Sequence, residues 1–282
     1  MTIIYAAILG LVQGIAEFLP ISSSGHLALL ENLLGSSGLA ELDGNAFFNI
    51  LLHFATLVAV CVAYWADIRD MIFEVGDMAV DLVKGRGLSA KGKPSRKLIY
   101  MLILATLPLF VIAPFDDYIE RLNAIPWFIG AALILTGTLL YRSDRLPRGR
   151  KTVENMSVVD ALIIGVAQGI ATIPGLSRSG TTIAAGMGRG LKRSFAVRFS
   201  FLMSLLSVTG AVILQVLDVL EEGIDMGMLP AYGVGMLVAG VSGYASIRLL
   251  QSIVRKGKFG GFAYYCWAVG VISIIVWVRL SV

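Results

Sequence analysis

Long apolar runs separated by short polar stretches dominate the pattern of this chain. The runs cover roughly residues 46–66, 99–115, 125–141, 196–219, 231–253 and 262–280. Apolar runs of about 17 to 25 residues form helices that cross the ~30 Å hydrocarbon core of a bilayer. The pattern therefore predicts an all-α polytopic membrane protein with six full transmembrane helices.

Two further apolar segments, residues 3–34 and 158–188, are interrupted near their middle. In the first, Pro20 and Gly25 flank a serine-rich turn and break the helix between two short arms. An arm of about 15 residues rises only about 22 Å, less than the hydrocarbon thickness. We expect each segment to be a re-entrant helical hairpin, its irregular tip covered by protein or lining a water-filled cavity.

The two hairpins carry the same polar motif. The segment that begins Gln13-Gly-Ile-Ala-Glu17 and ends Ser22-Ser23-Ser24-Gly25-His26 aligns without a gap to residues 168–181, 155 residues later. Seven of the fourteen positions are identical, including Ser22 with Ser177, Ser24 with Ser179 and Gly25 with Gly180. This indicates an internal duplication within one integral membrane domain, with repeat 1 at about residues 1–150 and repeat 2 at about 151–282.

The number of spans fixes the relation between the repeats. Each repeat has one hairpin and three spans, and an odd number of crossings delivers the chain to the opposite side. The second hairpin then enters from the other face, so the repeats are inverted and the tips meet near the bilayer middle.

The basic residues support this topology. It places the linkers 67–98, 142–157, 189–195 and 254–261 on one side, and these with their flanking ends hold 20 of the 23 Lys and Arg residues. Arg121 and Arg279 lie on the other side, and Arg178 lies in the second motif. By the positive-inside rule the basic side is cytoplasmic. We expect a cytoplasmic (inner) membrane protein with both termini and the first motif facing outside.

The composition agrees with this class. Of 282 residues, 57% are hydrophobic and 15% are charged, and the mean hydropathy of +0.81 is too high for a soluble globular domain. The net charge is +4, and the basic residues lie in short clusters between apolar runs. This distribution favours a role in membrane topology over nucleic-acid binding. We therefore predict no nucleic-acid partner. Cys61 and Cys266 lie in apolar runs and are interpreted as core residues.

The two motifs also hold the candidate chemistry. Glu17 and Arg178 are charged residues at membrane depth, which by default mark a functional site, with a structural ion pair as the alternative. Around them lie further polar and small residues: Gln13, Ser22, Ser23, Ser24, Gly25, His26, Ser177, Ser179, Gly180 and Thr181. An arginine fork together with serine–glycine turns at helix starts is suited to binding phosphate.

Several roles remain open on the residues alone. A serine could act as nucleophile, or His26 could activate water or protonate a leaving group. Glu17 could hold a divalent cation. We interpret His53, inside a predicted span, as a core histidine, and we assign Gln168 and the glycine-rich run 233–243 to helix packing.

The motifs Gln13-xxx-Glu17-Phe-Leu-Pro-xx-Ser-Ser-Ser-Gly-His26 and Pro174-Gly-Leu-Ser-Arg178-Ser-Gly-Thr resemble those of the undecaprenyl-diphosphate phosphatases of the bacitracin-resistance type. The resemblance extends over nearly the full length. It implies hydrolysis of a polyprenyl diphosphate lipid at the outer side of the membrane, which recycles the carrier for cell-wall precursors. It further implies Ser23 and His26 as catalytic, Arg178 as the diphosphate clamp, and a need for Mg²⁺ or Ca²⁺. The family pattern has Glu or Gln at the first position, so Glu17 is the essential carboxylate and the expected metal ligand.

Two alternatives were considered. Ser-Gly-His and Ser-Arg also occur in type-2 phosphatidic acid phosphatases, but those need a second histidine after Ser-Arg, and no histidine follows His53. A polyprenyl-phosphate flippase with the same architecture would use Arg178 for binding only. The attacking group (Ser23 assisted by His26, or a water activated by His26), the preferred metal and a homodimeric state are left open.

Overall fold

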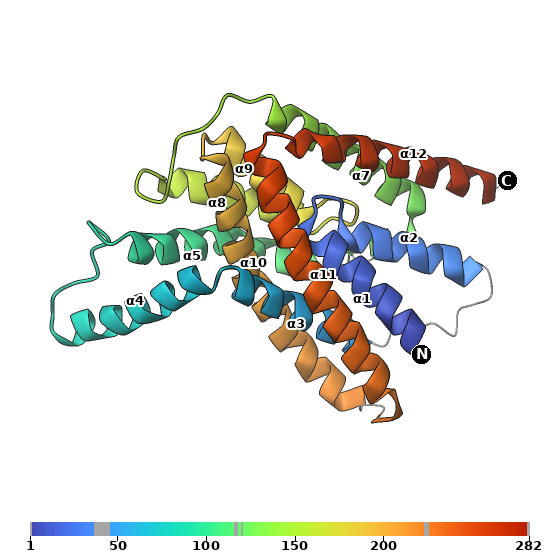
Figure 1. Cartoon of the computed structure of the whole chain (residues 1–282), viewed down its shortest axis with the longest axis horizontal. Helices are drawn as coiled ribbons and strands as arrows, with labels where there is room; N and C mark the ends of the chain where they lie inside the picture. Colours follow the sequence, from blue (N-terminus) through green and yellow to red (C-terminus); the bar gives the residue numbers. More distant parts are fainter. Residues whose placement is uncertain (1, 37–45, 116–117, 120, 223–225, 281–282) are drawn as a thin grey trace.

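The computed structural model of the chain is a bundle of helices (Figure 1). It describes residues 2–36, 46–115, 118–119, 121–222 and 226–280. The α-helices are α1 (Ile3–Phe18), α2 (Ser23–Ser36), α3 (Ala46–Ala63), α4 (Trp65–Val83), α5 (Pro94–Ile112), α7 (Pro126–Asp144), α8 (Val158–Ile170), α9 (Arg178–Gly188), α10 (Arg193–Glu222), α11 (Leu229–Arg255) and α12 (Phe262–Leu280). Short 3₁₀ turns lie at Ala113–Phe115, Arg121–Ala124, Met226–Met228 and Phe259–Gly261. Within these ranges the only β-type pairing is an isolated bridge between Lys151 and Leu191.

The helices include several that can cross a membrane, as the hydropathy pattern predicted. Four stretches have the required length and apolar character: Pro94–Phe115, Arg193–Ile213, Met226–Arg255 and Phe259–Arg279. The bent pair of α3 and α4 counts as a fifth if it forms one broken span. The protein is therefore an all-helical polytopic membrane protein. The expected span at 125–141 is present as α7, but it is not among these stretches, because polar residues such as Thr136, Thr138 and Arg142 lower its hydropathy.

The prediction that residues 67–98 form a linker was wrong for its first half. Residues Trp65–Val83 form α4, which turns 86° away from α3. On its acidic face, Glu74 and Asp81 each lie 2.7 Å from the guanidinium of Arg96, which is 1% exposed. The apolar residues on the other face are exposed. The charged residues make this segment polar on average, which favoured the linker prediction. Its acidic and apolar residues nevertheless recur with helical spacing, so the segment folds as an amphipathic helix.

Both broken segments fold as two helices joined by a tight turn, as expected. In the first, Ser22 adopts a left-handed backbone conformation (φ 71°) just before α2 begins. In the second, Gly175 does so (φ 89°), and an added Cβ there would lie 2.6 Å from the carbonyl oxygen of Ile129. A glycine is thus required at Gly175 both by its conformation and by the close approach of α7.

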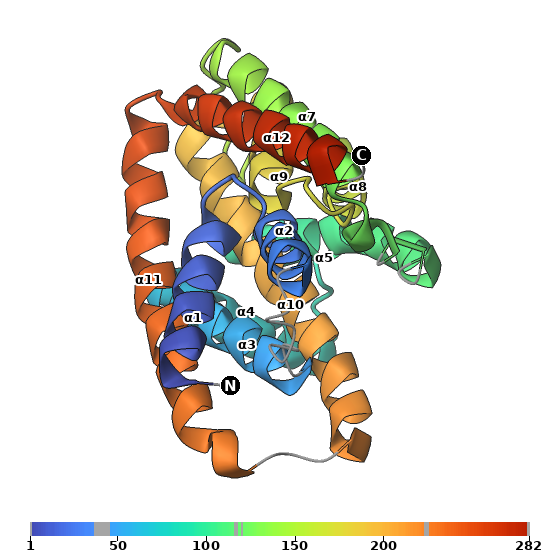
Figure 2. The same ribbon diagram turned by 90° about the vertical axis from the view of Figure 1, so that its right-hand side faces the viewer.

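The helix that leads into each copy of the motif packs closely on one other long helix. Helix α1 packs on α11, its counterpart α8 packs on α5, and α7 runs beside α12 (Figures 1 and 2). An added Cβ at Gly10 would lie 2.3 Å from the carbonyl oxygen of Gly235, and one at Gly165 would lie 2.3 Å from that of Ala105. Gly10 and Gly165 are 155 residues apart, the offset of the motif. The prediction that the glycine-rich run 233–243 serves close helix packing is confirmed by Gly235.

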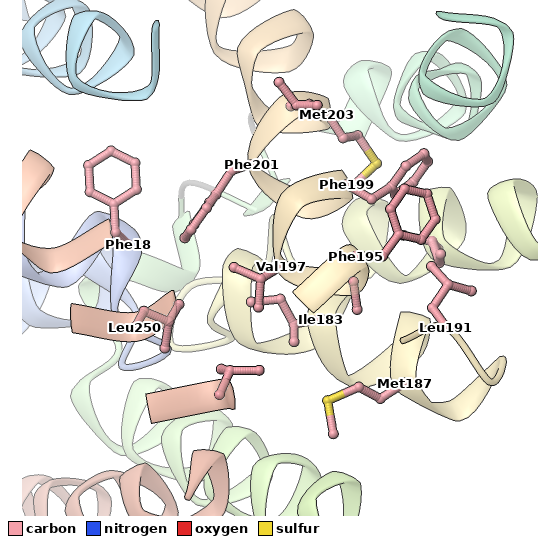
Figure 3. Close-up of a cluster of buried hydrophobic side chains, with 14 of the residues drawn as sticks. Phe18, Ile183, Met187, Leu191, Phe195, Val197, Phe199, Phe201, Met203 and Leu250 are labelled. Atoms are coloured by element: carbon pink, nitrogen blue, oxygen red, sulfur yellow. The ribbon is translucent and has the colours of Figure 1, made fainter. Parts of the chain in front are cut away.

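Helix α10 carries much of the hydrophobic core (Figure 3). Its Phe201 meets Phe18 of α1 edge to face at 5.5 Å, and Phe199 and Met203 are fully buried. Aromatic packing of this kind adds about 0.5–1.5 kcal/mol beyond the buried area. This core fixes the end of α1, and with it Glu17, against the middle of α10. Cys266 is buried, as predicted, whereas Cys61 is partly exposed.

Candidate active site

A serine caps the second helix of each hairpin. The Ser177 Oγ accepts a hydrogen bond from the backbone N–H of Gly180 at 3.1 Å, and the Ser22 Oγ accepts one from Gly25 at 3.3 Å. Each cap satisfies one of the free N–H groups at a helix start. Two of the seven identical positions of the motif, Ser22 with Ser177 and Gly25 with Gly180, therefore take part in the same local contact.

The two tips touch each other, as predicted. An added Cβ at Gly25 would lie 3.0 Å from the Cα of Gly175. An added Cβ at Gly180 would lie 3.1 Å from the Cβ of Pro20. The absence of a side chain at these glycines lets the two helix starts face one another at close range.

The contact between the tips is centred on Glu17, whose side chain is 7% exposed. Its Oε1 pairs with the Arg178 guanidinium of the other hairpin. Its Oε2 accepts hydrogen bonds from the Ser23 Oγ at 2.8 Å and from the Gln13 Nε2 at 3.3 Å. A carboxylate taken out of water needs such partners, and here it has one charged and two neutral donors.

Ser23 and Arg178 occupy the same position in the two repeats. Ser23 is the first residue of α2 and Arg178 is the first residue of α9. Both helix starts point free N–H groups and the positive end of the helix dipole toward the space between them. Such a space favours an anionic ligand.

The structure describes one large cavity at this place, of about 400 Å³. Its polar lining includes six of the predicted site residues: Glu17, Ser22, Ser23, Ser24, Ser177 and Arg178. His53, Thr106, Gln168, Thr172 and Ser207 complete the polar part. The rest is apolar and comes chiefly from the end of α5 and the turn after it (Leu109, Phe110, Ile112, Ala113) and from α10 (Leu206, Gly210, Ala211). The cavity is therefore polar at the tips and mostly apolar along α5 and α10, which also contribute Thr106 and Ser207.

His26 does not line this cavity. Its Nδ1 lies 2.8 Å from the backbone carbonyl oxygen of Ser22. A carbonyl oxygen only accepts, so Nδ1 carries the proton and donates the hydrogen bond. Its Nε2 lies 2.8 Å from the hydroxyl of Tyr265, and the two rings stack at 5.6 Å. Both ring nitrogens of His26 are thus engaged, Nδ1 within its own hairpin and Nε2 with α12.

The remaining predicted residues lie at the edge of the site. Gln13 is buried and contacts Glu17, and Ser179 faces a small second pocket that also contains Glu17 and Arg178. Gly25 and Gly180 form the contact between the tips, and Thr181 is buried behind it.

Sequence reasoning missed three parts of the site. His53 lies at the cavity and not in the apolar core as expected, 3.2 Å from the Gln13 Nε2. Gln168 and Thr172 also line the cavity, and their signal was available, since they stand at the offset of Gln13 and Glu17. The apolar lining from α5 and α10 could not be predicted, because its residues are of the same types as those of every other predicted span.

The fold and this cavity define an all-helical polytopic membrane protein in which two hairpin tips build one amphipathic pocket around an arginine–carboxylate pair. Residues 6–272 match the family described as "Bacitracin resistance protein BacA". The chain belongs to this family, since the match covers nearly its whole length.

Similar proteins over the full length support this membership. The chain is 40% identical over 276 residues to a protein of Alkaliphilus metalliredigens, covering 98% of each chain. It is 38% identical over 277 residues to a protein of Halothermothrix orenii, covering 98% of each. It is 39% identical over 285 residues to a protein of Methanosphaera stadtmanae, covering 99% of this chain and 100% of the other. Each of the three is named "Undecaprenyl-diphosphatase".

Proposed function

We propose that this protein is an undecaprenyl-diphosphate phosphatase, which converts undecaprenyl diphosphate to undecaprenyl phosphate and free phosphate. The activity recycles the lipid carrier of cell-wall synthesis and thereby confers resistance to bacitracin. The observation that carries the proposal is the amphipathic cavity, because a single pocket offers Arg178 and two helix starts at one end and apolar helices at the other. A diphosphate group attached to a polyprenyl chain matches both ends.

The apolar part of the cavity leads the lipid chain toward the bilayer. Phe110 on α5 is 73% exposed and Leu206 on α10 is 45% exposed, although both also line the cavity. Side chains that belong to both the cavity and the lipid-facing surface mark an opening between α5 and α10. The prenyl chain passes through this opening while the diphosphate stays at the tips.

Ser23 is the proposed nucleophile and Glu17 its proton acceptor. The distance of 2.8 Å between the Ser23 Oγ and Glu17 Oε2 is within reach for direct proton transfer. The Ser23 Oγ attacks the terminal phosphorus, the bond from that phosphorus to the bridging oxygen breaks, and undecaprenyl phosphate leaves. Water then attacks the phosphoserine, releases phosphate and restores the Ser23 hydroxyl, while Glu17 returns its proton to the products.

Arg178 acquires a second partner during this cycle. In the structure its guanidinium pairs with Glu17, and the substrate phosphate binds to the N–H groups that this pair leaves free. A guanidinium offers several N–H groups in a planar fork, so it can bind phosphate while holding the carboxylate. Developing charge on the transferred phosphoryl group is stabilised in the same way.

The catalytic role of His26 stays a prediction. It lies three residues after Ser23, on the first turn of α2, and its Nδ1–H binds the Ser22 carbonyl within the left-handed turn. To reach a water or the leaving group, its Nε2 has to leave the Tyr265 hydroxyl. Without that movement His26 supports Ser23 by holding the turn that precedes it.

A divalent cation, Mg²⁺ or Ca²⁺, fits the donors at the tip only in part. Within the described residues there is no cluster of three His, Cys, Asp or Glu side chains. Glu17 supplies a carboxylate, and the Oε1 of Gln13 is a buried carbonyl oxygen without a hydrogen-bond partner. These two residues would hold the ion together with phosphate oxygens of the substrate, which suits Mg²⁺. When bound, it would neutralise charge on the diphosphate.

We also propose inverted repeats of one re-entrant hairpin and three spans each, in the cytoplasmic membrane, with both termini and the first motif outside. The matched packing of α1 on α11 and of α8 on α5 supports the repeat, and the charge distribution supports the orientation. A cysteine introduced at Ser89, in the loop before α5, should resist an impermeant thiol reagent in intact cells. Labelling of that cysteine would contradict the orientation.

The activity is tested by phosphate release from undecaprenyl diphosphate by the purified protein in detergent, with and without Mg²⁺ or Ca²⁺. We expect metal-dependent release that is lost in His26→Ala and in Ser23→Ala. Binding of the lipid without any release by the folded wild type would instead indicate the flippase alternative.

A further inference from the structure

His53 on α3 is the second histidine of the chain, and the mechanism above does not use it. The side chain is neither fully buried nor in the apolar core; it lines the same cavity as Glu17, Ser23 and Arg178. An imidazole in that position can donate or accept a hydrogen bond, depending on which nitrogen carries the proton.

The surroundings fix that choice. The ionised carboxylate of Glu17 only accepts hydrogen bonds, so the amide group of Gln13 must turn its NH₂ toward Glu17 Oε2, at 3.3 Å. The same nitrogen lies 3.2 Å from the Nδ1 of His53. The second amide hydrogen of Gln13 therefore points to Nδ1, which accepts it. Neutral His53 then carries its proton on Nε2.

The Nε2–H of His53 has no hydrogen-bond partner in the part of the chain that the structure describes. Its backbone carbonyl accepts from Thr56, and its Nδ1 contacts Gln13, which leaves Nε2 as the free group of a ring at the cavity wall. Polar hydrogens in such an environment are nearly always satisfied, by protein, water or ligand.

We propose that His53 is a substrate-contacting residue whose Nε2–H donates a hydrogen bond to a non-bridging oxygen of the lipid diphosphate, while Arg178 binds the same group from the second hairpin. The inference rests on the proposed phosphatase function. Gln13 acts through His53 as a positioning residue. Its amide donates to the His53 Nδ1, which fixes the tautomer of the ring, and to the Glu17 carboxylate.

A matched set of variants separates the two ring nitrogens. His53→Gln places an amide N–H near the position of Nε2, His53→Asn places one near Nδ1, and His53→Leu has neither. A hydrogen bond to a charged group contributes a factor of roughly 10 to 100. We expect kcat/KM to fall by roughly this factor in His53→Asn and His53→Leu, and to stay within about threefold of wild type in His53→Gln.

Binding of undecaprenyl diphosphate is measured separately in a Ser23→Ala background, where turnover is removed. The dissociation constant should rise for His53→Asn and not for His53→Gln, at unchanged melting temperature. Wild-type turnover and binding in His53→Leu and His53→Asn would overturn the proposal. It would also be overturned if His53→Asn kept wild-type turnover and binding while His53→Gln lost them. Wild-type protein that releases no phosphate would instead refute the phosphatase function itself, so the two failures are distinguishable.

Discussion

The hydrogen bond between Ser23 and Glu17 makes the sharpest prediction about mechanism. If Ser23 is the nucleophile and Glu17 takes its proton, removing either one disables the same step. Ser23→Ala deletes the Oγ that lies 2.8 Å from the carboxylate, and Glu17→Gln keeps the shape but loses the basic oxygen. General-base catalysis contributes about 10²- to 10⁴-fold, equivalent to about 2.7 to 5.5 kcal/mol in the barrier.

The two variants should therefore not be additive. Each single variant is expected to lower kcat by about 10² or more, and the double variant should fall no further than the worse single one. Residues that acted independently would instead multiply their effects, giving a loss of about 10⁴ or more.

The assay is phosphate release under saturating lipid, with melting temperature recorded for each variant. Ser273→Ala is a matched control, because this α12 hydroxyl donates to the Pro126 carbonyl at 3.0 Å, away from the cavity, and turnover should be preserved. Multiplicative losses in the double variant, or near-normal turnover in Ser23→Ala, would refute the reasoning and favour attack by water.

Three further substitutions test the clamp, the lipid opening and the packing. Arg178→Lys keeps the charge but loses the planar fork, so kcat/KM should fall by about 10- to 100-fold in the release assay, and unchanged kinetics would exclude a fork-like contact. Gly210→Leu has open space for its side chain and narrows the apolar part of the cavity. We expect kcat/KM to fall more for undecaprenyl diphosphate than for a short prenyl diphosphate. An equal fall for both substrates would contradict the opening between α5 and α10. Gly165→Ala places a methyl group against the Ala105 carbonyl, so the free energy of unfolding should fall by about 1–3 kcal/mol and the melting temperature should drop. Gly76→Ala meets no neighbouring atom and should leave the melting temperature unchanged.

Much of the helical layout could be predicted from the sequence because it depends on local features. Helix lengths follow the apolar runs, and the break near Pro20 is visible as a residue that cannot continue a helix. The pairing of Glu17 with Arg178 was also foreseeable, since a lone charge at membrane depth needs a partner of opposite sign.

The missed features depend on contacts between distant segments. His53 reaches the site only because α3 packs beside α1, and nothing in its neighbours Leu52 and Phe54 indicates which way the ring faces. The position of His26 against Tyr265 is likewise a matter of side-chain orientation across 239 residues of sequence. Helix α4 was missed for a different reason, because its acidic residues hid an amphipathic period inside a charged stretch.

The two copies of the motif contribute different groups to the proposed chemistry. The shared residues Ser22 and Ser177 cap their helices through the same bond, so what the repeats have in common is the scaffold of the tip. Position 23 and its equivalent 178 differ: one provides a hydroxyl and the other a guanidinium, each on the first residue of a helix that faces the cavity. One hairpin has only one such position and cannot supply both groups from it. In the proposed mechanism, bringing the two tips together places the nucleophile and the anion-binding guanidinium at one cavity, with Glu17 in contact with both.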